Sequence, residues 1–394
     1  MLPGPSAAPS KPNSLDWAAV RAEFPTLERW TFLDVARKTP APRCQERAMQ
    51  AYLRDIYEEA GAQAWSVPQI TETRAALARL LGAKPAEIAF TKNTTEGLTI
   101  AAHAFDLAAG DNIVLTDMEH VANVWVWKHW QAKGVEIRVA RNRAGRLPVE
   151  AFEEVMDART RLVSTAYVTY GNGYRIDLPA LGRLCQNRGA RLVVDGVQAA
   201  GILAAPLSAL GADMVAIGGH KGLFGLTGSG IVWCREALLE ELRAPFLKPP
   251  GAAAAPSAHV NSQFDYVRTA HRFEGGNPNF LGVRVLREGA RFLESIGLAA
   301  IEARVRELTD AFLRRLAAAG LATTTPQEWE RRAQIVSVPL TDAAGVMQRL
   351  RDKHRVVVNA KDGALRVSMS FFNNEADLDI AIRALKQETR GEAG

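Results

Sequence analysis

Two segments decide the fold: RLVVDGVQAAG, residues 191–201, and AIGGHKGLFGLTGSG, residues 216–230. In the first, an apolar run that is typical of a buried strand ends in an acid, Asp195. In the second, Lys221 follows His220 in a glycine-rich loop, and glycine lets the backbone take positive φ and approach a ligand closely. An acid at a strand end and a loop lysine soon after it are what a pyridoxal 5′-phosphate (PLP) site needs.

Strands and helices alternate on both sides of these segments. Strands are predicted at 87–91, 112–116, 135–139, 161–168, 191–194, 214–217 and 230–234, and helices at 94–105, 121–133, 149–158 and 178–188. Such alternation predicts an α/β domain with a mainly parallel sheet. Ligands of these sheets bind beyond the carboxyl ends of the strands. Asp195, the segment 91–95 and the pair 119–120 all fall at such ends.

The chain divides into four predicted parts. Residues 1–14 read as a disordered arm, and residues 15–32 as an N-terminal segment that packs with a small domain. Residues 33–280 form the large cofactor-binding domain, with an exposed loop at 248–263. Residues 281–394 form the small α+β domain. Its predicted helices are 281–320, 343–353 and 375–386, and its strands are 335–339, 356–359 and 364–368; earlier helices are predicted at 16–24, 43–59 and 71–81.

Composition excludes several classes of protein. The chain has 394 residues and a formal net charge of +5, but its 48 basic and 43 acidic residues are interspersed, so nucleic acid is not an expected partner. No apolar run is long enough to span a membrane. Cys44, Cys185 and Cys234 lie far apart, so neither a metal site nor a redox pair is predicted. Scattered cysteines and a start without an apolar signal region favour a cytoplasmic location.

Further residues fit a PLP site, although each has a structural alternative. Thr94 and Thr95 begin a helix and suit a phosphate group, or they simply cap that helix. His120 follows a strand and could stack on a planar ring, or it could be structural. Gln198 lies three residues after Asp195 and could contact the ring phenolate. Lys221 itself could be a solvated loop lysine.

Asp195 and His220 are also candidates for contacts with the ring and the phosphate, and Arg366 is a candidate for binding a substrate. Asp195 could cap a helix instead of pairing with the pyridine nitrogen. His220 could supply a second phosphate contact. Arg366 lies between apolar neighbours on a predicted strand, where a planar guanidinium could clamp an α-carboxylate through two hydrogen bonds. The alternative for Arg366 is a surface salt bridge.

In this order the segments resemble the class V aminotransferase and cysteine desulfurase-like branch of fold type I PLP enzymes, over about residues 21–382. The motifs that carry the resemblance are TFLDVARKTPAP, FTKNTTEGLTIAA, DMEHVAN, VVDGVQAAG, GGHKGLFGLTGSG, RFEGGNPNF and LRVSMSFFNNEAD. The resemblance implies a large domain with a mainly parallel seven-stranded sheet and a smaller α+β C-terminal domain. It makes Lys221 the Schiff-base lysine and His120 the ring-stacking histidine. It also implies a homodimer in which the region of Asn277 reaches the neighbouring active site.

The departures from the family pattern concern function. Desulfurases carry a nucleophilic cysteine on a loop shortly before the carboxylate-binding arginine, and here that region reads DKHRVVVNAKDGALR. On this ground cysteine desulfuration is not expected. Gly218 stands where the family often has serine, and Asn277 stands in place of a threonine. The phenolate-binding asparagine has no clean match, and Asn172 is one candidate, placed near the substrate.

The expected activity is therefore that of a PLP enzyme acting at Cα or Cβ of an α-amino acid, through an external aldimine and a quinonoid. Arg366 holds the carboxylate and Lys221 is the base at Cα. Lyase or carbon–carbon bond chemistry is favoured, with transamination and epimerisation as alternatives. A non-catalytic PLP-binding protein is a remote alternative. For a second substrate carboxylate the candidates are Arg175, Arg268 and Arg272.

Overall fold

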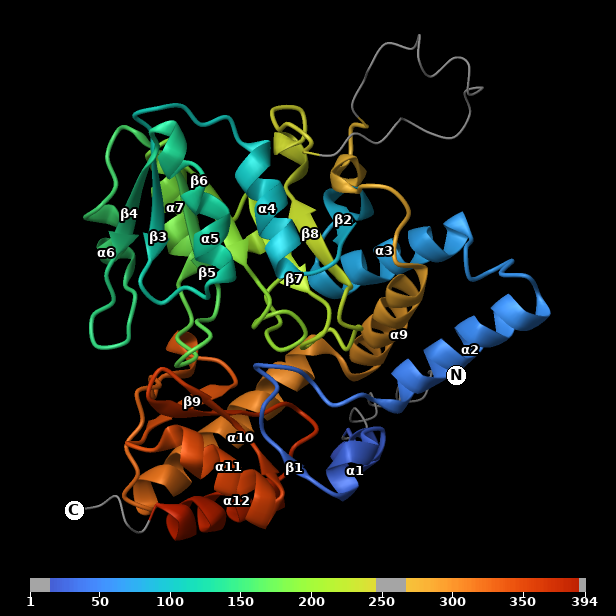
Figure 1. Cartoon of the computed structure of the whole chain (residues 1–394), viewed down its shortest axis with the longest axis vertical. Coiled ribbons are helices and arrows are strands. Elements are labelled where there is room, and N and C mark those ends of the chain that lie inside the picture. The colour runs from blue at the N-terminus through green and yellow to red at the C-terminus, as the bar shows by residue number, and fades with distance from the viewer. Residues whose placement is uncertain (1–14, 246–266, 390–394) are drawn as a thin grey trace, which may run out of the picture.

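The computed structural model describes residues 15–245 and 267–389, which form two lobes (Figure 1). The predicted arm at 1–14 and loop at 248–263 lie outside the described residues. The upper lobe in Figure 1 contains the large sheet, and the lower lobe contains the C-terminal helices together with α1 and β1. No helix among the described residues is long and apolar enough to cross a membrane.

A seven-stranded sheet with the order β2-β8-β7-β6-β5-β3-β4 forms the centre of the upper lobe. Neighbouring strands are parallel except at β8, which is antiparallel to both β2 and β7. The strands are β2 (Ile88–Thr91), β3 (Asn112–Thr116), β4 (Glu136–Ala140), β5 (Thr160–Ala166), β6 (Arg191–Asp195), β7 (Met214–Gly218) and β8 (Gly230–Cys234). The prediction of an α/β fold with a mainly parallel sheet is confirmed.

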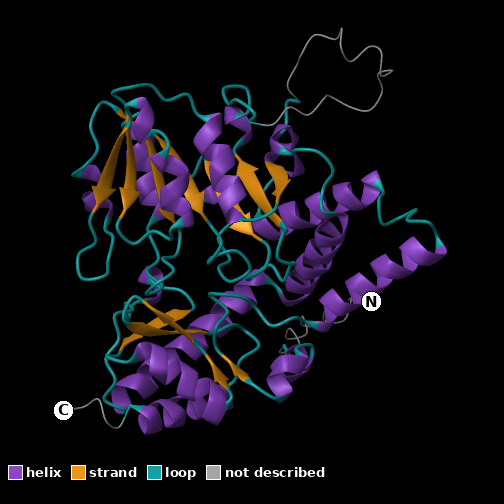
Figure 2. Cartoon of the chain, viewed as in Figure 1, coloured by secondary structure: helices purple, strands orange, loops and turns teal. Residues whose placement is uncertain are grey.

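Helices cover both faces of this sheet because its strands are apolar on both sides (Figure 2). In β6, Val193 packs in the core below α4 and α5, whereas Leu192 and Val194 pack in the core on the opposite face. One face carries α4 (Thr94–Ala104) and α5 (Ala122–Lys128), and the other carries α3 (Val67–Leu81), α6 (Val149–Glu153) and α7 (Leu178–Asn187). Both α5 and α6 end earlier than the sequence predicts.

The lower lobe is built on a three-stranded antiparallel sheet with the order β11-β12-β9. Its strands are β9 (Ile335–Pro339), β11 (Asn359–Lys361) and β12 (Ala364–Ser368), and its helices are α10 (Leu298–Ala318), α11 (Ala343–His354) and α12 (Glu375–Glu388). The predicted strand 356–359 divides in two. Val356–Val357, β10, pairs with Thr31–Phe32, β1, whereas β11 pairs with β12.

The N-terminal segment is tied to this lobe. Helix α1 (Trp17–Ala22) begins at Asp16, whose carboxylate accepts from the backbone N–H groups of Ala18 and Ala19. Its Arg21 pairs with Asp377 at 2.7 Å. Helix α2 (Arg43–Glu58) then leads to the upper lobe. The domain boundaries themselves stay a prediction.

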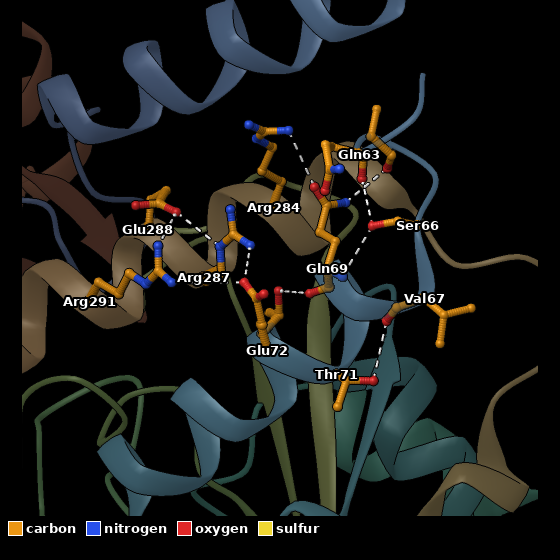
Figure 3. Close-up of polar contacts among 12 residues, drawn as sticks. Gln63, Ser66, Val67, Gln69, Thr71, Glu72, Arg284, Arg287, Glu288 and Arg291 are labelled. Carbon is orange, nitrogen blue, oxygen red and sulfur yellow. Dashed lines mark hydrogen bonds and ion pairs between the residues drawn. The ribbon is translucent and has the colours of Figure 1, made fainter. Parts of the chain in front are cut away.

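A long helix, α9 (Phe280–Ile296), connects the lobes and packs along α2 and α3. The predicted helix 281–320 is interrupted at Gly297, where φ is +88°. Polar contacts line the seam between α3 and α9 (Figure 3). Arg287 donates to Glu72 at 2.8 Å and to Glu288 at 3.0 Å. These contacts hold α3 of the upper lobe against α9, the helix that leads to the lower lobe.

A close backbone approach constrains the loop that carries Lys221. Gly201, with φ +76°, lies against Gly222, and a Cβ at position 201 would overlap the carbonyl oxygen of Gly222. At this point the loop after β6 and the loop after β7 meet backbone to backbone. Glycine is required at position 201 both by its φ and by this contact.

This contact predicts an unequal effect of two glycine substitutions. Gly189 also has positive φ, at +69°, but a Cβ there would meet nothing within 4 Å. We expect Gly189→Ala to lower the free energy of unfolding by about 1 kcal/mol, the cost of left-handed backbone. Gly201→Ala should cost roughly 1–3 kcal/mol more, because the loops must separate. Urea unfolding followed by circular dichroism measures both, and equal losses would contradict the proposed contact.

Candidate active site

A cavity of about 560 Å³ lies where the carboxyl ends of the parallel strands face the lower lobe. Its lining includes Asp195 and Lys221 from the upper lobe and Met347 and Arg366 from the lower one. Every predicted site residue except Asn172 and Asn277 lines it: Thr94, Thr95, His120, Asp195, Gln198, His220, Lys221 and Arg366. The structure thus brings together residues that lie up to 272 positions apart, from Thr94 to Arg366.

Asp195 and Lys221 form the buried end of the cavity. Asp195 is the last residue of β6, is 5% exposed and accepts from the backbone N–H of Val197 at 3.0 Å. Burial raises the pKa of its carboxyl, against this hydrogen bond and the charge of Lys221. Burial also lowers the pKa of the Lys221 amine to about 8, although the charge of Asp195 opposes that shift. A larger share of the amine is therefore unprotonated, and nucleophilic, near neutral pH.

The N-terminus of α4 forms an anion-binding end. Asn93 caps this helix by accepting from the backbone N–H of Glu96 at 2.9 Å. The backbone N–H groups of Thr94 and Thr95 lie in the first turn, where a helix offers no acceptors, so they suit a phosphate. His220 has a buried Nδ1 atom without a partner among the described residues. Burial lowers the pKa of His220 to about 4, so its ring is neutral and can donate one hydrogen bond.

Position 218, where the family often has serine, is tightly packed. A Cβ at Gly218 would lie 3.0 Å from the Thr94 hydroxyl oxygen and 3.1 Å from the ring of His220. Both distances are shorter than ordinary van der Waals contacts, so a side chain at position 218 would require Thr94 and His220 to shift by a few tenths of an ångström.

Gln198 and His120 lie on the walls of the cavity. The Gln198 amide donates to the carbonyl of Ala36 at 2.9 Å, and its Oε1 atom is buried without a described partner. His120 accepts from the backbone N–H of Ala122 at 3.2 Å, and its ring stands edge-on to Tyr170 with centroids 5.3 Å apart. Burial and then the charge of Lys221 lower the pKa of His120, which favours the neutral ring that stacking requires.

Arg366 extends from β12 into the cavity and is 3% exposed. Its Nη1 donates to the carbonyl of Tyr170 at 2.9 Å, and its Nη2 lies 3.5 Å from the carboxylate of Asp34. Burial raises the pKa of Asp34, against the charge of Arg366. The Nε atom of Arg366 is buried and has no described partner. Arg366 thus forms a buried ion pair instead of the surface salt bridge that was its alternative, and its Nε atom is left unsatisfied.

The unsatisfied atoms test whether PLP fits these residues. Buried polar atoms without a partner are rare in folded proteins. Three of them, His220 Nδ1, Gln198 Oε1 and Arg366 Nε, belong to side chains that line this one cavity. The same cavity holds a lysine with a lowered pKa, an acid at a strand end and a free helix N-terminus. This set matches the amine, ring-nitrogen and phosphate contacts of PLP.

Two predicted residues are not brought to this cavity. The Asn172 amide accepts from the Thr169 hydroxyl at 2.7 Å and donates to the carbonyl of Gly145 at 2.8 Å, so it stabilises a loop instead of facing substrate. Asn277 is exposed and borders a separate cavity beside Lys92 and Glu96. The expected role of Asn277 in a neighbouring subunit stays a prediction.

Sequence reasoning missed two cations in the cavity lining, Arg37 and Lys361. The candidates for a second carboxylate site lie elsewhere: Arg175 pairs with Glu302 at 3.3 Å, and Arg272 donates to backbone carbonyls. Arg268 does not line the cavity either. The Asp-Gly pair after Lys361 was a readable hairpin signal that places this lysine next to Arg366.

The cysteines also lie away from the cavity. Cys44, Cys185 and Cys234 are the only cysteines of the chain, and each is buried and free. Burial raises the thiol pKa to about 11 for Cys44 and about 12 for the other two. None of them lines the cavity. These thiols are therefore protonated and poor nucleophiles near neutral pH.

Comparison with known proteins identifies the family. The family model for class-V aminotransferases matches residues 31–381. The chain belongs to the class-V aminotransferase family. The predicted family, the fold type I architecture and the dependence on PLP are thereby confirmed, and the protein is a PLP-dependent enzyme. The lysine, acid and helix terminus described above are the residues of this family member that would hold the cofactor.

Relatives of this family member are cysteine desulfurases. A probable cysteine desulfurase from Methanothermobacter thermautotrophicus is 30% identical over 297 residues, which cover 74% of this chain and 73% of the relative. The apo structure of a cysteine desulfurase from Thermococcus onnurineus NA1 superimposes with a TM-score of 0.84 at 24% identity, over 95% of this chain and 98% of that one.

A third similar protein, compared by structure, is C-DES. A lysine-to-alanine variant of C-DES, with glycine covalently linked to its PLP cofactor, has a TM-score of 0.85 at 20% identity and covers 93% of this chain and 98% of that one. A second structure is described as the complex between the cystine C–S lyase C-DES and its reaction product cysteine persulfide. At this identity the likeness supports the fold.

The prediction that the protein is not a cysteine desulfurase is wrong. It rested on a missing cysteine, whereas the relatives at 30–33% identity are cysteine desulfurases. The deduction failed because one missing side chain does not outweigh the rest of the chain: Lys221, Asp195 and Arg366 all line the cavity.

The lowered pKa of Lys221 predicts its reactivity with pH. In protein stripped of cofactor, we expect labelling of Lys221 by acetic anhydride, relative to exposed Lys92, to rise with pH around a midpoint near 8. Asp195→Asn should move this midpoint lower, because the Asp195 charge favours the protonated amine. Mass spectrometry of peptides measures both. A midpoint near that of free lysine, about 10.4, would contradict burial as the cause.

Proposed function

We propose that this enzyme cleaves the Cβ–S bond of cysteine or a cysteine derivative, as a desulfurase-type member of its family. The observation that carries the proposal is that Lys221, Asp195 and Arg366 share one cavity in a chain whose curated relatives are cysteine desulfurases. The lowered pKa of Lys221 and the unsatisfied Nε of Arg366 support it.

When bound, PLP supplies an electron sink for the charge that develops at Cα. The residues of the chain supply the rest. Arg366 holds the substrate α-carboxylate through its free Nε edge, and its contacts with Asp34 and the Tyr170 carbonyl keep the guanidinium in place. Lys221 takes the proton from Cα. Asp195 holds a proton on the cofactor ring nitrogen, and its burial limits competition from water.

The sulfur needs an acceptor for the reaction to balance. Cleavage of the Cβ–S bond to give alanine transfers one sulfur atom to a thiol, RSH, which becomes the persulfide RSSH, while the thiol proton ends on carbon. The three cysteines of the chain are buried away from the cavity. We therefore propose that the acceptor is a thiol of a second molecule.

Product analysis tests the proposed reaction. With L-cysteine and dithiothreitol, we expect equal amounts of alanine and sulfide. Lys221→Ala should lower the rate at least about a hundredfold, the usual contribution of a general base. Lys92→Ala, an exposed lysine outside this cavity, serves as the matched control. Pyruvate in place of alanine, or no alanine from either cysteine or an S-substituted cysteine, would contradict the proposal.

We also propose that the enzyme is a homodimer, in the cytoplasm, that uses the face around α2 and α3. Four large apolar side chains are exposed there: Leu53, Tyr57, Trp65 and Val67. Helix α9 packs against both helices and begins directly after the loop of Asn277, so this loop lies on the same side of the molecule. An interface there would bury the apolar side chains and bring Asn277 toward a second subunit.

The mass of the protein in solution tests this interface. We expect twice the chain mass by light scattering coupled to size-exclusion chromatography. Tyr57→Glu should shift the mass toward that of one chain, because it would bury a charge without a partner. Trp125→Glu is the matched control, since Trp125 is also exposed but lies on α5. A native mass of one chain, or equal effects of the two changes, would refute the interface.

A further inference from the structure

The hairpin that precedes Arg366 holds a lysine in the cavity. Strands β11 and β12 are joined by the two residues Asp362 and Gly363, whose φ values of +51° and +73° are those of a tight hairpin turn. The Tyr170 hydroxyl donates to the carboxylate of Asp362 at 2.9 Å. Lys361 is the last residue of β11, so its backbone is held by this short turn and by the contact between Tyr170 and Asp362.

The register of this hairpin sets the direction of Lys361. Asn359 pairs with Arg366, and Lys361 pairs with Ala364. Because side chains alternate along a strand and paired residues share a face, Asn359, Lys361 and Arg366 project from the same face. All three line the cavity. The opposite face of β12, with Leu365 and Val367, is buried in the lower core.

Arg37 brings a second cation to the cavity from the loop after β1. Both Arg37 and Lys361 are exposed, and neither forms an ion pair or side-chain hydrogen bond with any residue that the structure describes. Asp34 pairs with Arg366 and also feels the charge of Arg37, and Asp362 accepts from the Tyr170 hydroxyl. Among the described residues, the cavity lining nevertheless holds four Lys or Arg side chains against a single acid, Asp195.

We propose that Lys361 and Arg37 bind a second negative charge, located on the substrate side chain beyond Cβ. This inference rests on the proposed function, because Arg366 is then occupied by the α-carboxylate and the amine lies at Lys221. Lys361 and Arg37 line the same cavity as these two groups, so they are the cations left for a charge on the remaining substituent. The favoured substrates are cysteine derivatives whose sulfur substituent is anionic, and neutral derivatives of the same size bind less well.

A pair of ligands that differ only in charge tests this inference. S-carboxymethylcysteine carries a carboxylate, and S-carbamoylmethylcysteine carries an amide of the same shape. We expect the holoenzyme to bind the carboxylate roughly tenfold more tightly by calorimetry, the effect of one charge-assisted hydrogen bond. Lys361→Gln and Arg37→Gln should each remove most of this preference, whereas Lys361→Arg should retain it.

Lys38→Gln is the matched control, because it removes the same charge one residue from Arg37 but outside the cavity lining. It should leave the preference unchanged. Equal binding of the two ligands by the unchanged enzyme, or equal losses for both ligands in Lys361→Gln, would overturn the inference. The assay measures affinity alone. An enzyme that shows the preference but yields no alanine from cysteine or from either ligand would refute the proposed function and leave the second anion site standing.

Discussion

The active site depends on the close backbone approach of two loops, where Ala200 and Gly201 lie against Gly222. The sheet places the ends of β6 and β7 side by side, but it does not determine how closely the loops that follow approach each other. Because Gly201 and Gly222 have no side chains, the loops meet directly beside Lys221. Asp195, at the end of β6, and Lys221, in the loop after β7, therefore line one cavity.

Burial then gives these two groups their chemical character. It raises the pKa of the Asp195 carboxyl and lowers that of the Lys221 amine, and each group partly offsets the shift of the other through its charge. His220 and His120 are shifted toward the neutral form by the same desolvation. The site thus combines an amine ready to react with neutral rings that can stack and donate hydrogen bonds, and the positive charge of Arg366 further favours the unprotonated amine.

The sequence predicted elements well where local pattern decides them. The bounds 112–116, 230–234, 335–339 and 364–368 agree with β3, β8, β9 and β12, because apolar runs between turn residues define these strands. Most of the predicted site residues follow strands of the large sheet. They share the cavity because the carboxyl ends of parallel strands meet at one edge of the sheet. Arg37 was missed because its place in the cavity depends on the meeting of two lobes, whereas Lys361 could have been found from the hairpin signal of Asp362 and Gly363. Asn172 failed because its neighbours in the loop already satisfy its amide.

The division of the cavity between two lobes has a consequence for substrate length. Lys221 belongs to the upper lobe and Arg366 to the lower one, and α9 leads from the first lobe to the second (Figure 1). A substrate whose carboxylate is held at Arg366 and whose reacting carbon lies near Lys221 therefore contacts both lobes at once. Any change in how the lobes meet would alter the distance between these two groups, and with it the length of substrate that fits.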